Sequence, residues 1–330
     1  MCTYNGARFL DQQLASLTSQ RRLPDDVVIC DDCSTDETCN LLSDFAATAP
    51  FPVNLIQNKT RRGSTKNFEQ AIALCQGEVI ALCDQDDEWL PDKLASTINV
   101  FETRPEVGLV FCDAELIDEN GTAQGERLWD SINFDAGMKA KIKGSRGYEI
   151  LDRRVLITGM TMAFRAKFRE LILPFPQNGP LIHDGWIALI ISHVADIDFV
   201  DRPLARYRQH SSQQLGAPIL KPETSVTGST LMESARRATT WDKQLRKVQL
   251  VRHRMDARGD SYHFRGHENL ENLQRHFEIR ESATKKKLVT LPYLLRELVT
   301  GRYHKYSNGL GSLLKDLLGS GAKDHGPPVD

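Results

Sequence analysis

Short apolar runs, separated by segments with helical periodicity, occupy the first 115 residues of the chain. The runs are Val27–Cys30, Val53–Ile56, Val79–Cys83 and Leu109–Cys112. Apolar strands with little polar alternation are typical of a sheet that is covered on both faces. Between them, apolar residues recur three or four positions apart, which predicts helices. This alternation predicts an α/β fold with a mostly parallel sheet flanked by helices.

The predicted first strand is short. A turn at Asn5–Gly6 is followed at once by a helical pattern from Phe9, so that only Met1–Tyr4 remain for the strand. Two interpretations stay open: either this strand is a stub, or the natural chain starts further upstream.

Length and charge divide the chain into two parts. Its 330 residues suffice for about two domains, and we expect the α/β domain over residues 1–216 and a helical extension over 217–330. Residues 221–330 contain 20 Lys and Arg against 13 Asp and Glu, so this part carries +7 and the remainder −9 of the total −2. The acidic body argues against nucleic acid as a partner, whereas the basic part favours an anionic membrane surface.

The sequence predicts a cytoplasmic protein, and peripheral contact with the inner face of the cell membrane is one alternative for its C-terminal part. No apolar run reaches the roughly 18–20 residues of a membrane-spanning helix, and no secretory signal is visible. The seven cysteines, all within the first 112 residues, indicate reduced thiols. In the amphipathic stretch 282–298, Lys285–Lys287 precede several leucines. This stretch either lies on an anionic bilayer or packs its leucines on the body of the protein.

Acidic residues follow the third predicted strand directly. Asp84, Asp86, Asp87 and Glu88 stand within five positions, and residues two apart in an extended segment point the same way. Ligands of open α/β sheets bind at the carboxyl ends of the strands. Because Mg²⁺ is typically held by one or two carboxylates together with substrate phosphates, the cluster suggests a metal that bridges the protein to a diphosphate. The alternative is an acidic turn at the start of the next helix.

Seven ordered blocks together resemble the family 2 glycosyltransferases. They are Thr3–Gly6, Cys30–Thr38, Asn58–Phe68, Asp84–Lys93, Thr158–Phe164, His183–Trp186 and Tyr207–His210. The resemblance covers roughly residues 1–210 and implies an inverting, nucleotide-sugar-dependent enzyme with a GT-A, Rossmann-like fold. The residue sequences of three blocks, DQDDEW, HDGW and YRQH, are similar to those of the rhamnosyltransferase-like branch of the family. One departure is Cys33, which stands where the family usually has glycine, so we expect a tighter or displaced turn there.

The resemblance assigns roles to individual residues. Asp184 is the expected catalytic base, which removes a proton from the acceptor hydroxyl. Asp86 is the expected metal ligand and His210 a further one, for Mg²⁺ or Mn²⁺. The expected contacts of the nucleotide sugar are Thr3, Tyr4, Asp31, Asp32, Lys66, Asp84 and Gly159.

The function implied is transfer of a sugar, rhamnose being one candidate, from a nucleoside diphosphate to a glycan or lipid-linked acceptor in bacterial surface polysaccharide synthesis. An alternative is a catalytically impaired module of the same fold that only binds nucleotide sugars or glycans. Cys30 and Cys33 form a C-x-x-C pair, but no second pair or matching His pair follows. Redox chemistry or a structural zinc site is therefore disfavoured.

Overall fold

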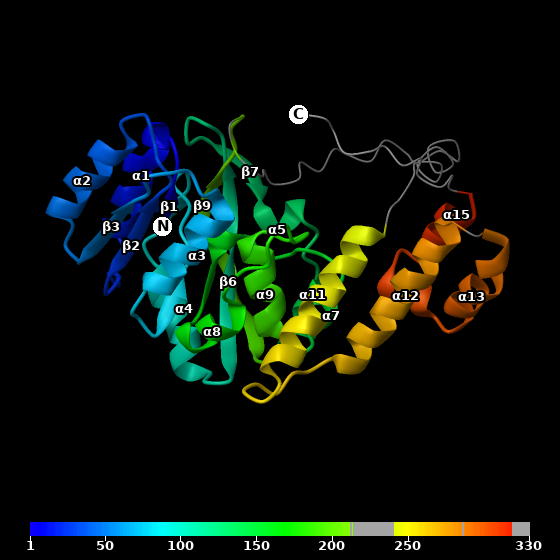
Figure 1. Ribbon diagram of the computed structural model, residues 1–330. Helices are drawn as coiled ribbons and strands as arrows, with labels where there is room; N and C mark the ends of the chain where they lie inside the picture. The colour runs from blue at the N-terminus through cyan, green and yellow to red at the C-terminus, as the bar shows by residue number, and fades with distance from the viewer. Residues whose placement is uncertain (212, 214–240, 286, 319–330) are drawn as a thin grey trace. The chain divides into compact units, whose positions relative to one another are not determined.

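The computed structural model describes residues 1–211, 213, 241–285 and 287–318 (Figure 1). The chain divides into two compact units. Unit 1 holds the described residues up to 213 except 178–180, and unit 2 holds 178–180 and the described residues from 241 onward. The boundary predicted at residues 216 and 217 lies outside the described residues, so its position stays a prediction.

Unit 1 begins with a three-stranded parallel sheet, in the order β1–β2–β3. These strands are β1 (Cys2–Thr3), β2 (Val27–Asp31) and β3 (Val53–Gln57), joined through the helices α1 (Ala7–Thr18) and α2 (Thr38–Thr48). The helical crossovers return the chain in the same direction, which makes these strands parallel. The α/β prediction is confirmed for this part, and β1 comprises only two residues.

The second sheet of unit 1 is mixed, with the order β4–β8–β6–β9–β5 and with β7 beside β6. Its strands are β4 (Val79–Ala81), β5 (Glu88–Trp89), β6 (Val107–Ile117), β7 (Ala123–Arg127), β8 (Met162–Arg165) and β9 (Asp196–Arg208). Here β6 and β9 pair in parallel, whereas the other pairs are antiparallel. A short turn joins β6 to β7, which permits only an antiparallel pair.

Helices cover the strands of unit 1, and α4 and α9 pack against β6 (Figure 1). Every residue of α9 is buried, as expected for a helix that is apolar around most of its circumference. Besides α1 and α2, the helices are α3 (Ser64–Leu74), α4 (Lys93–Thr103), α5 (Leu128–Ser131), α6 (Ala136–Lys143), α7 (Tyr148–Leu151), α8 (Arg169–Ile172) and α9 (His183–Ser192), with 3₁₀ turns at η1 (Gly159–Thr161) and η2 (Ala166–Phe168).

Unit 2 is helical in its described residues, as the sequence predicts. Its helices are α11 (Asp242–Arg258), α12 (His267–Lys285), α13 (Lys287–Val299), α14 (Arg302–Tyr306) and α15 (Leu310–Leu318). A buried ion pair joins Arg280 of α12 to Asp316 of α15 at 2.6 Å. Helix α13 continues through Pro292. In the part of the chain that the structure describes, no helix is long and apolar enough to cross a membrane.

Candidate active site at the ends of the strands

A cavity of about 540 Å³ lies where β1, β2 and β4 end. Six of the predicted site residues line it, although they come from four separate blocks of the sequence; these six are Thr3, Tyr4, Asp32, Asp84, Asp86 and the predicted base Asp184. The carboxyl ends of neighbouring strands meet at one edge of the sheet, which brings these blocks together.

Four carboxylates line this cavity, those of Asp32, Asp84, Asp86 and Asp184. Burial, together with repulsion from Asp86 and Asp184, raises the pKa of Asp84 to about 7. Asp87 is buried behind them, and its pKa is also raised by burial and by the charge of Asp86 and Asp84. A cationic partner would relieve this repulsion.

His210 lies against one of these carboxylates. Its Nε2 atom is 2.9 Å from Oδ2 of Asp86, and its ring packs on Phe9 with 4.6 Å between ring centroids. One carboxylate oxygen and one imidazole nitrogen thus lie close together beside the cavity. Both are atom types that bind Mn²⁺ as ligands in proteins. No group of three or more His, Cys, Asp or Glu side chains able to hold a metal occurs among the described residues. The pair therefore fits a cation that also takes ligands from phosphate or water.

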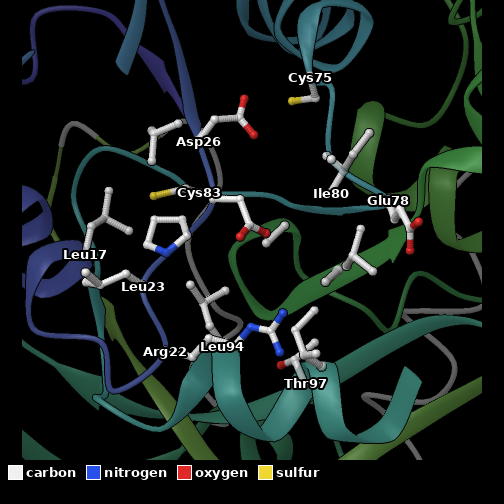
Figure 2. Close-up of a pocket in the computed structure, with 18 of the residues that line it drawn as sticks. Leu17, Arg22, Leu23, Asp26, Cys75, Glu78, Ile80, Cys83, Leu94 and Thr97 are labelled. Carbon is white, nitrogen blue, oxygen red and sulfur yellow. The ribbon is translucent and has the colours of Figure 1, made fainter. Parts of the chain in front are cut away.

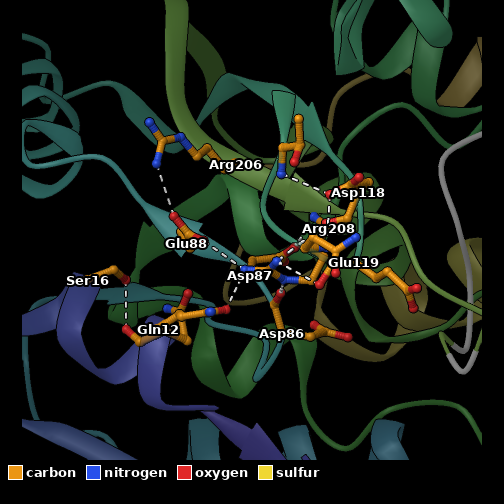
Figure 3. Close-up of polar contacts among 12 residues, drawn as sticks. Gln12, Ser16, Asp86, Asp87, Glu88, Asp118, Glu119, Arg206 and Arg208 are labelled. Carbon is orange, nitrogen blue, oxygen red and sulfur yellow. Dashed lines mark hydrogen bonds and ion pairs between the residues drawn. The ribbon is translucent and has the colours of Figure 1, made fainter. Parts of the chain in front are cut away.

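Arg208 fixes the acidic segment to the end of β9 (Figure 3). Its side chain is fully buried, and its Nε donates a hydrogen bond of 2.8 Å to the backbone oxygen of Asp86. One terminal nitrogen also donates to Glu88 at 2.7 Å and to Gln12 at 2.8 Å. The backbone N–H of Arg208 donates to Asp87. This network positions the segment that carries Asp86.

The predicted base, Asp184, lies in the first turn of α9 and is 9% exposed. One of its carboxylate oxygens accepts a hydrogen bond of 3.1 Å from the backbone N–H of Gly159, and the other accepts one from the backbone N–H of Gly185. Burial raises the pKa of Asp184 above its usual range, although these two bonds act in the opposite direction. The carboxylate is therefore held in a fixed orientation at the cavity wall.

His183, the neighbour of Asp184, stacks on Phe68 with 4.0 Å between ring centroids. Burial lowers the pKa of His183 to about 3, so its ring is neutral at physiological pH. In the described structure its Nδ1 atom is buried without a hydrogen-bond partner. A neutral stacked ring beside Asp184 adds an apolar surface to the cavity rather than a charge.

The predicted nucleotide-binding residues differ in how far they reach the cavity. Asp32 lines it, and its two oxygens accept hydrogen bonds of 2.7 and 2.8 Å from the backbone N–H groups of Arg62 and Gly63. Tyr4 also lines it, and the guanidinium of Arg61 lies 4.0 Å from the centre of its ring. The backbone of Tyr4 is held by the side-chain amide of Gln85 through two hydrogen bonds.

Asp31, Lys66 and Gly159 are not among the residues that line the cavity. Asp31 is fully buried and accepts hydrogen bonds from Thr3 and Ser34. Lys66 forms an ion pair of 2.7 Å with Glu69, and Gly159 contacts Asp184 as described above. Their predicted contacts with the nucleotide sugar stay predictions.

The turn after Asp32 contains Cys33, the residue at which the sequence departs from the family pattern. Cys33 has a φ of 67°, in the left-handed region that favours glycine. The turn therefore keeps the backbone that glycine would adopt. Burial raises the pKa of the neighbouring Cys30 thiol to about 11, whereas redox-active thiols require a lowered pKa.

Sequence reasoning did not single out Gln85, Arg61 or Arg208 as contributors to this site. Arg208 stands inside the Tyr207–His210 block, so the block itself was a signal for it. Gln85 lies between two of the predicted acids. The sequence offers no signal for Arg61, because its position over Tyr4 depends on the path of the 58–63 loop.

Known proteins resemble the chain in sequence and in fold. An uncharacterised glycosyltransferase of Nostoc sp. is 28% identical over 218 residues, which span 63% of each chain. The dTDP-rhamnosyl transferase RfbG of Shigella flexneri is 26% identical over 66% of this chain and 74% of its own length. An uncharacterised protein of Mycobacterium tuberculosis is 32% identical over 126 residues, which cover 36% of its length. The match thus spans less than two thirds of the Nostoc and Mycobacterium proteins.

Among solved structures, S. aureus TarS 1–349 in complex with UDP-GlcNAc shares the fold, with a TM-score of 0.52 and 15% identity over 96% of this chain and 88% of that chain. The family model described as Glycosyl transferase family 2 matches residues 1–171, more than half of the chain. Together with the α/β architecture, this match shows that the chain belongs to glycosyltransferase family 2.

Proposed function

We propose that the chain is a metal-dependent, inverting glycosyltransferase that moves a sugar from a nucleoside diphosphate to a hydroxyl of a glycan or lipid-linked acceptor. The observation that carries this proposal is the meeting of Asp84, Asp86 and Asp184 at one cavity of about 540 Å³. Transfer requires both a group that faces the charged donor and a group that receives a proton. Asp84 and Asp86 suit the first task, and Asp184 suits the second.

The proposed reaction is a single displacement at the anomeric carbon. Asp184 accepts the proton of the acceptor hydroxyl while the hydroxyl oxygen forms a bond to that carbon. The bond from the carbon to the diphosphate oxygen breaks, its electron pair leaves with the nucleoside diphosphate, and the configuration inverts. The N–H groups of Gly159 and Gly185 orient the Asp184 carboxylate for this proton transfer.

We propose that Asp86 and His210 hold Mg²⁺ or Mn²⁺, since Oδ2 of Asp86 and Nε2 of His210 lie 2.9 Å apart beside the cavity. A bound divalent ion would stabilise the negative charge of the departing diphosphate. Asp84, Asp32, Tyr4 and Thr3 would contact the nucleotide sugar.

We propose dTDP-rhamnose as the first donor to test, within bacterial surface polysaccharide synthesis. The support is the relative named as a dTDP-rhamnosyl transferase, which is similar over 74% of its length. UDP-GlcNAc, UDP-glucose and GDP-mannose complete the panel, each with Mg²⁺, with Mn²⁺ and with EDTA, scored by thermal shift and by donor hydrolysis. If no donor is bound or hydrolysed with either metal, the enzymatic proposal is wrong.

Replacing Asp86 should weaken metal-dependent donor binding. We expect Asp86→Ala to lower the affinity for Mn²⁺ by at least about 10- to 100-fold, because one of two protein ligands is lost. Calorimetric titration of Mn²⁺ in the presence of the donor measures this change. The matched control is Asp44→Ala, which removes an exposed carboxylate from α2. Equal affinity of both variants for Mn²⁺ would contradict the assignment of Asp86.

We also propose that unit 2 contacts an anionic membrane surface. Helix α13 exposes Leu291, Leu295 and Val299 at successive turns. Exposed apolar residues at this spacing, in a part of the chain with a net charge of +7, suit a bilayer with acidic lipids. The side chains of Lys285–Lys287, on which the sequence prediction rests, are not described, so their part in this contact stays a prediction.

Making this helix face polar should reduce membrane binding. We expect Leu295→Ser together with Val299→Ser to lower co-sedimentation with phosphatidylglycerol-containing vesicles about tenfold, because the buried apolar area decreases. Val155→Ser serves as the control, since it changes an apolar side chain that is 54% exposed in unit 1. Unchanged co-sedimentation of the double variant would reject the contact.

A further inference from the structure

The segment Tyr4–Gly6, which directly follows β1, is bonded to two acidic blocks of the site. Asn5 joins it to the block after β2, because the N–H of Asn5 donates to Oγ of Ser34 at 2.8 Å and its side-chain oxygen accepts from the N–H of Thr35 at 2.8 Å. The block after β4 is joined to the segment through the side chain of Gln85. The segment therefore connects two parts of the chain that lie far apart in the sequence and meet at the active-site cavity.

The side-chain amide of Gln85 bonds the backbone of Tyr4 in the way that a neighbouring strand would. Its Oε1 accepts a hydrogen bond of 2.8 Å from the N–H of Tyr4, and its Nε2 donates one of 3.1 Å to the carbonyl oxygen of Tyr4. Because a primary amide presents a donor and an acceptor side by side, the two bonds fix both the position and the orientation of this backbone. Tyr4 and Gln85 both line the active-site cavity.

Side-chain packing is incomplete beside the acidic segment. Cys83, the residue before Asp84, lines a second cavity of about 460 Å³ (Figure 2). The strands β1 and β4 belong to different sheets, and no backbone ladder pairs them in the described part of the chain. The two hydrogen bonds of Gln85 therefore join the end of β1 to the segment that follows β4 at a place where neither a ladder nor close packing does so.

Gly6 leaves the space that this amide occupies. A Cβ atom on Gly6 would lie 2.3 Å from Oε1 and 2.5 Å from Cδ of Gln85, which is closer than Cβ atoms approach other atoms in proteins. The φ of Gly6 is −102°, a value that alanine adopts without backbone strain. The space needed by Gln85, rather than the conformation of the backbone, therefore requires glycine at this position.

We propose that Gln85 is a positioning residue of the donor site: it fixes the backbone of Tyr4 at the cavity wall, and Gly6 provides the room for it. The effect on the donor rests on the proposed function, in which Tyr4 contacts the nucleotide sugar. The guanidinium of Arg61 lies 4.0 Å from the centre of the Tyr4 ring, so the same contact also fixes the ring on which Arg61 packs. Loss of the Gln85 amide should weaken donor binding and leave the hydrogen bonds of Asp184 intact.

The test is a double-mutant cycle of Gln85→Ala and Gly6→Ala. We expect each single variant to lower the affinity for dTDP and for UDP, measured with Mn²⁺, by about tenfold, because the hydrogen bonds to Tyr4 are lost. In the Gln85→Ala protein, Gly6→Ala should have no further effect beyond about twofold, since the clash partner is gone. Hydrogen exchange of the Tyr4 amide, which needs no ligand, should become at least about tenfold faster in all three variants.

Steady-state kinetics separate positioning from a general loss of structure. With the donor identified by the panel of nucleotide sugars, we expect Gln85→Ala to raise KM by about tenfold and to keep kcat within about twofold, whereas partial unfolding would lower kcat at constant KM. Gln85→Met keeps the length of the side chain without its amide, so it should match Gln85→Ala, and it replaces that variant if the alanine protein does not fold. The controls are Gln76→Ala, at an exposed residue, and Gly77→Ala, whose Cβ would lie 3.5 Å from its nearest neighbour; neither should change these quantities.

Three results would overturn the proposal. The first is an additive effect of the two substitutions, since Gly6 would then act independently of Gln85. The second is unchanged exchange of the Tyr4 amide in Gln85→Ala, and the third is unchanged nucleotide affinity despite faster exchange. If the unchanged protein binds no nucleotide at all, the transferase proposal is wrong, whereas the exchange measurement still tests the contact between Gln85 and Tyr4.

Discussion

The variant Asp184→Asn is expected to lose sugar transfer by about 10²- to 10⁴-fold, the usual contribution of a positioned general base. The amide keeps the size of the carboxylate but has no capacity to take up the acceptor proton. Donor affinity should stay within about threefold of the unchanged protein, because Asp184 is proposed to face the acceptor. Single-turnover transfer and calorimetric donor binding separate these two quantities.

The pH dependence gives this prediction a second measurement. Burial raises the pKa of Asp184, and a base acts only when it is deprotonated. On acidification, the transfer rate should therefore begin to decrease at a pH above the usual pKa range of aspartate. The stability of the protein should be measured over the same pH range. Asp184→Ala is the second variant. In asparagine the amide NH₂ group would face one of the two backbone N–H groups, of Gly159 or Gly185, that donate to the carboxylate, whereas alanine places no donor against them. Transfer at the normal rate by either variant would remove Asp184 from the mechanism.

The variant Arg208→Ala is expected to lower the free energy of unfolding by about 3–5 kcal/mol, as removal of one partner from a buried charge network does. The change leaves the backbone oxygen of Asp86 and the side-chain oxygen of Gln12 without the donor that Arg208 provides, whereas Glu88 keeps its ion pair with Arg206. Because the same bonds position the acidic segment, donor affinity should fall as well. Denaturant unfolding measures the first effect and donor titration the second.

Arg206→Ala is the matched control for Arg208. Arg206 lies two residues earlier on β9 and pairs with Glu88 at 3.1 Å, but its side chain is 43% exposed. Exposed ion pairs contribute about 0–1 kcal/mol, so this variant should be nearly as stable as the unchanged protein. Equal destabilisation by both variants would mean that burial of Arg208 does not determine its contribution.

Local patterns in the sequence were sufficient to predict several strands and helices of the first 117 residues. The apolar runs became β2, β3, β4 and β6, and the helical periodicities became α1 to α4. By contrast, β5 consists only of Glu88 and Trp89, and no two-residue pattern predicts a strand. It exists because its backbone pairs with Ala205 and Arg206, more than a hundred residues away.

Within the site, the resemblance of short ordered blocks to those of the family determined which side chains were candidates, and the acidic and histidine-containing blocks carry chemistry that few other residues offer. Distances between those blocks were decided only by the tertiary structure. The pairing of β5 with β9 carries Arg208 and His210 to the acidic segment, and the first turn of α9 brings Asp184 to the same cavity. Such contacts join residues separated by about a hundred positions, and their energies depend on burial that no local window of sequence contains.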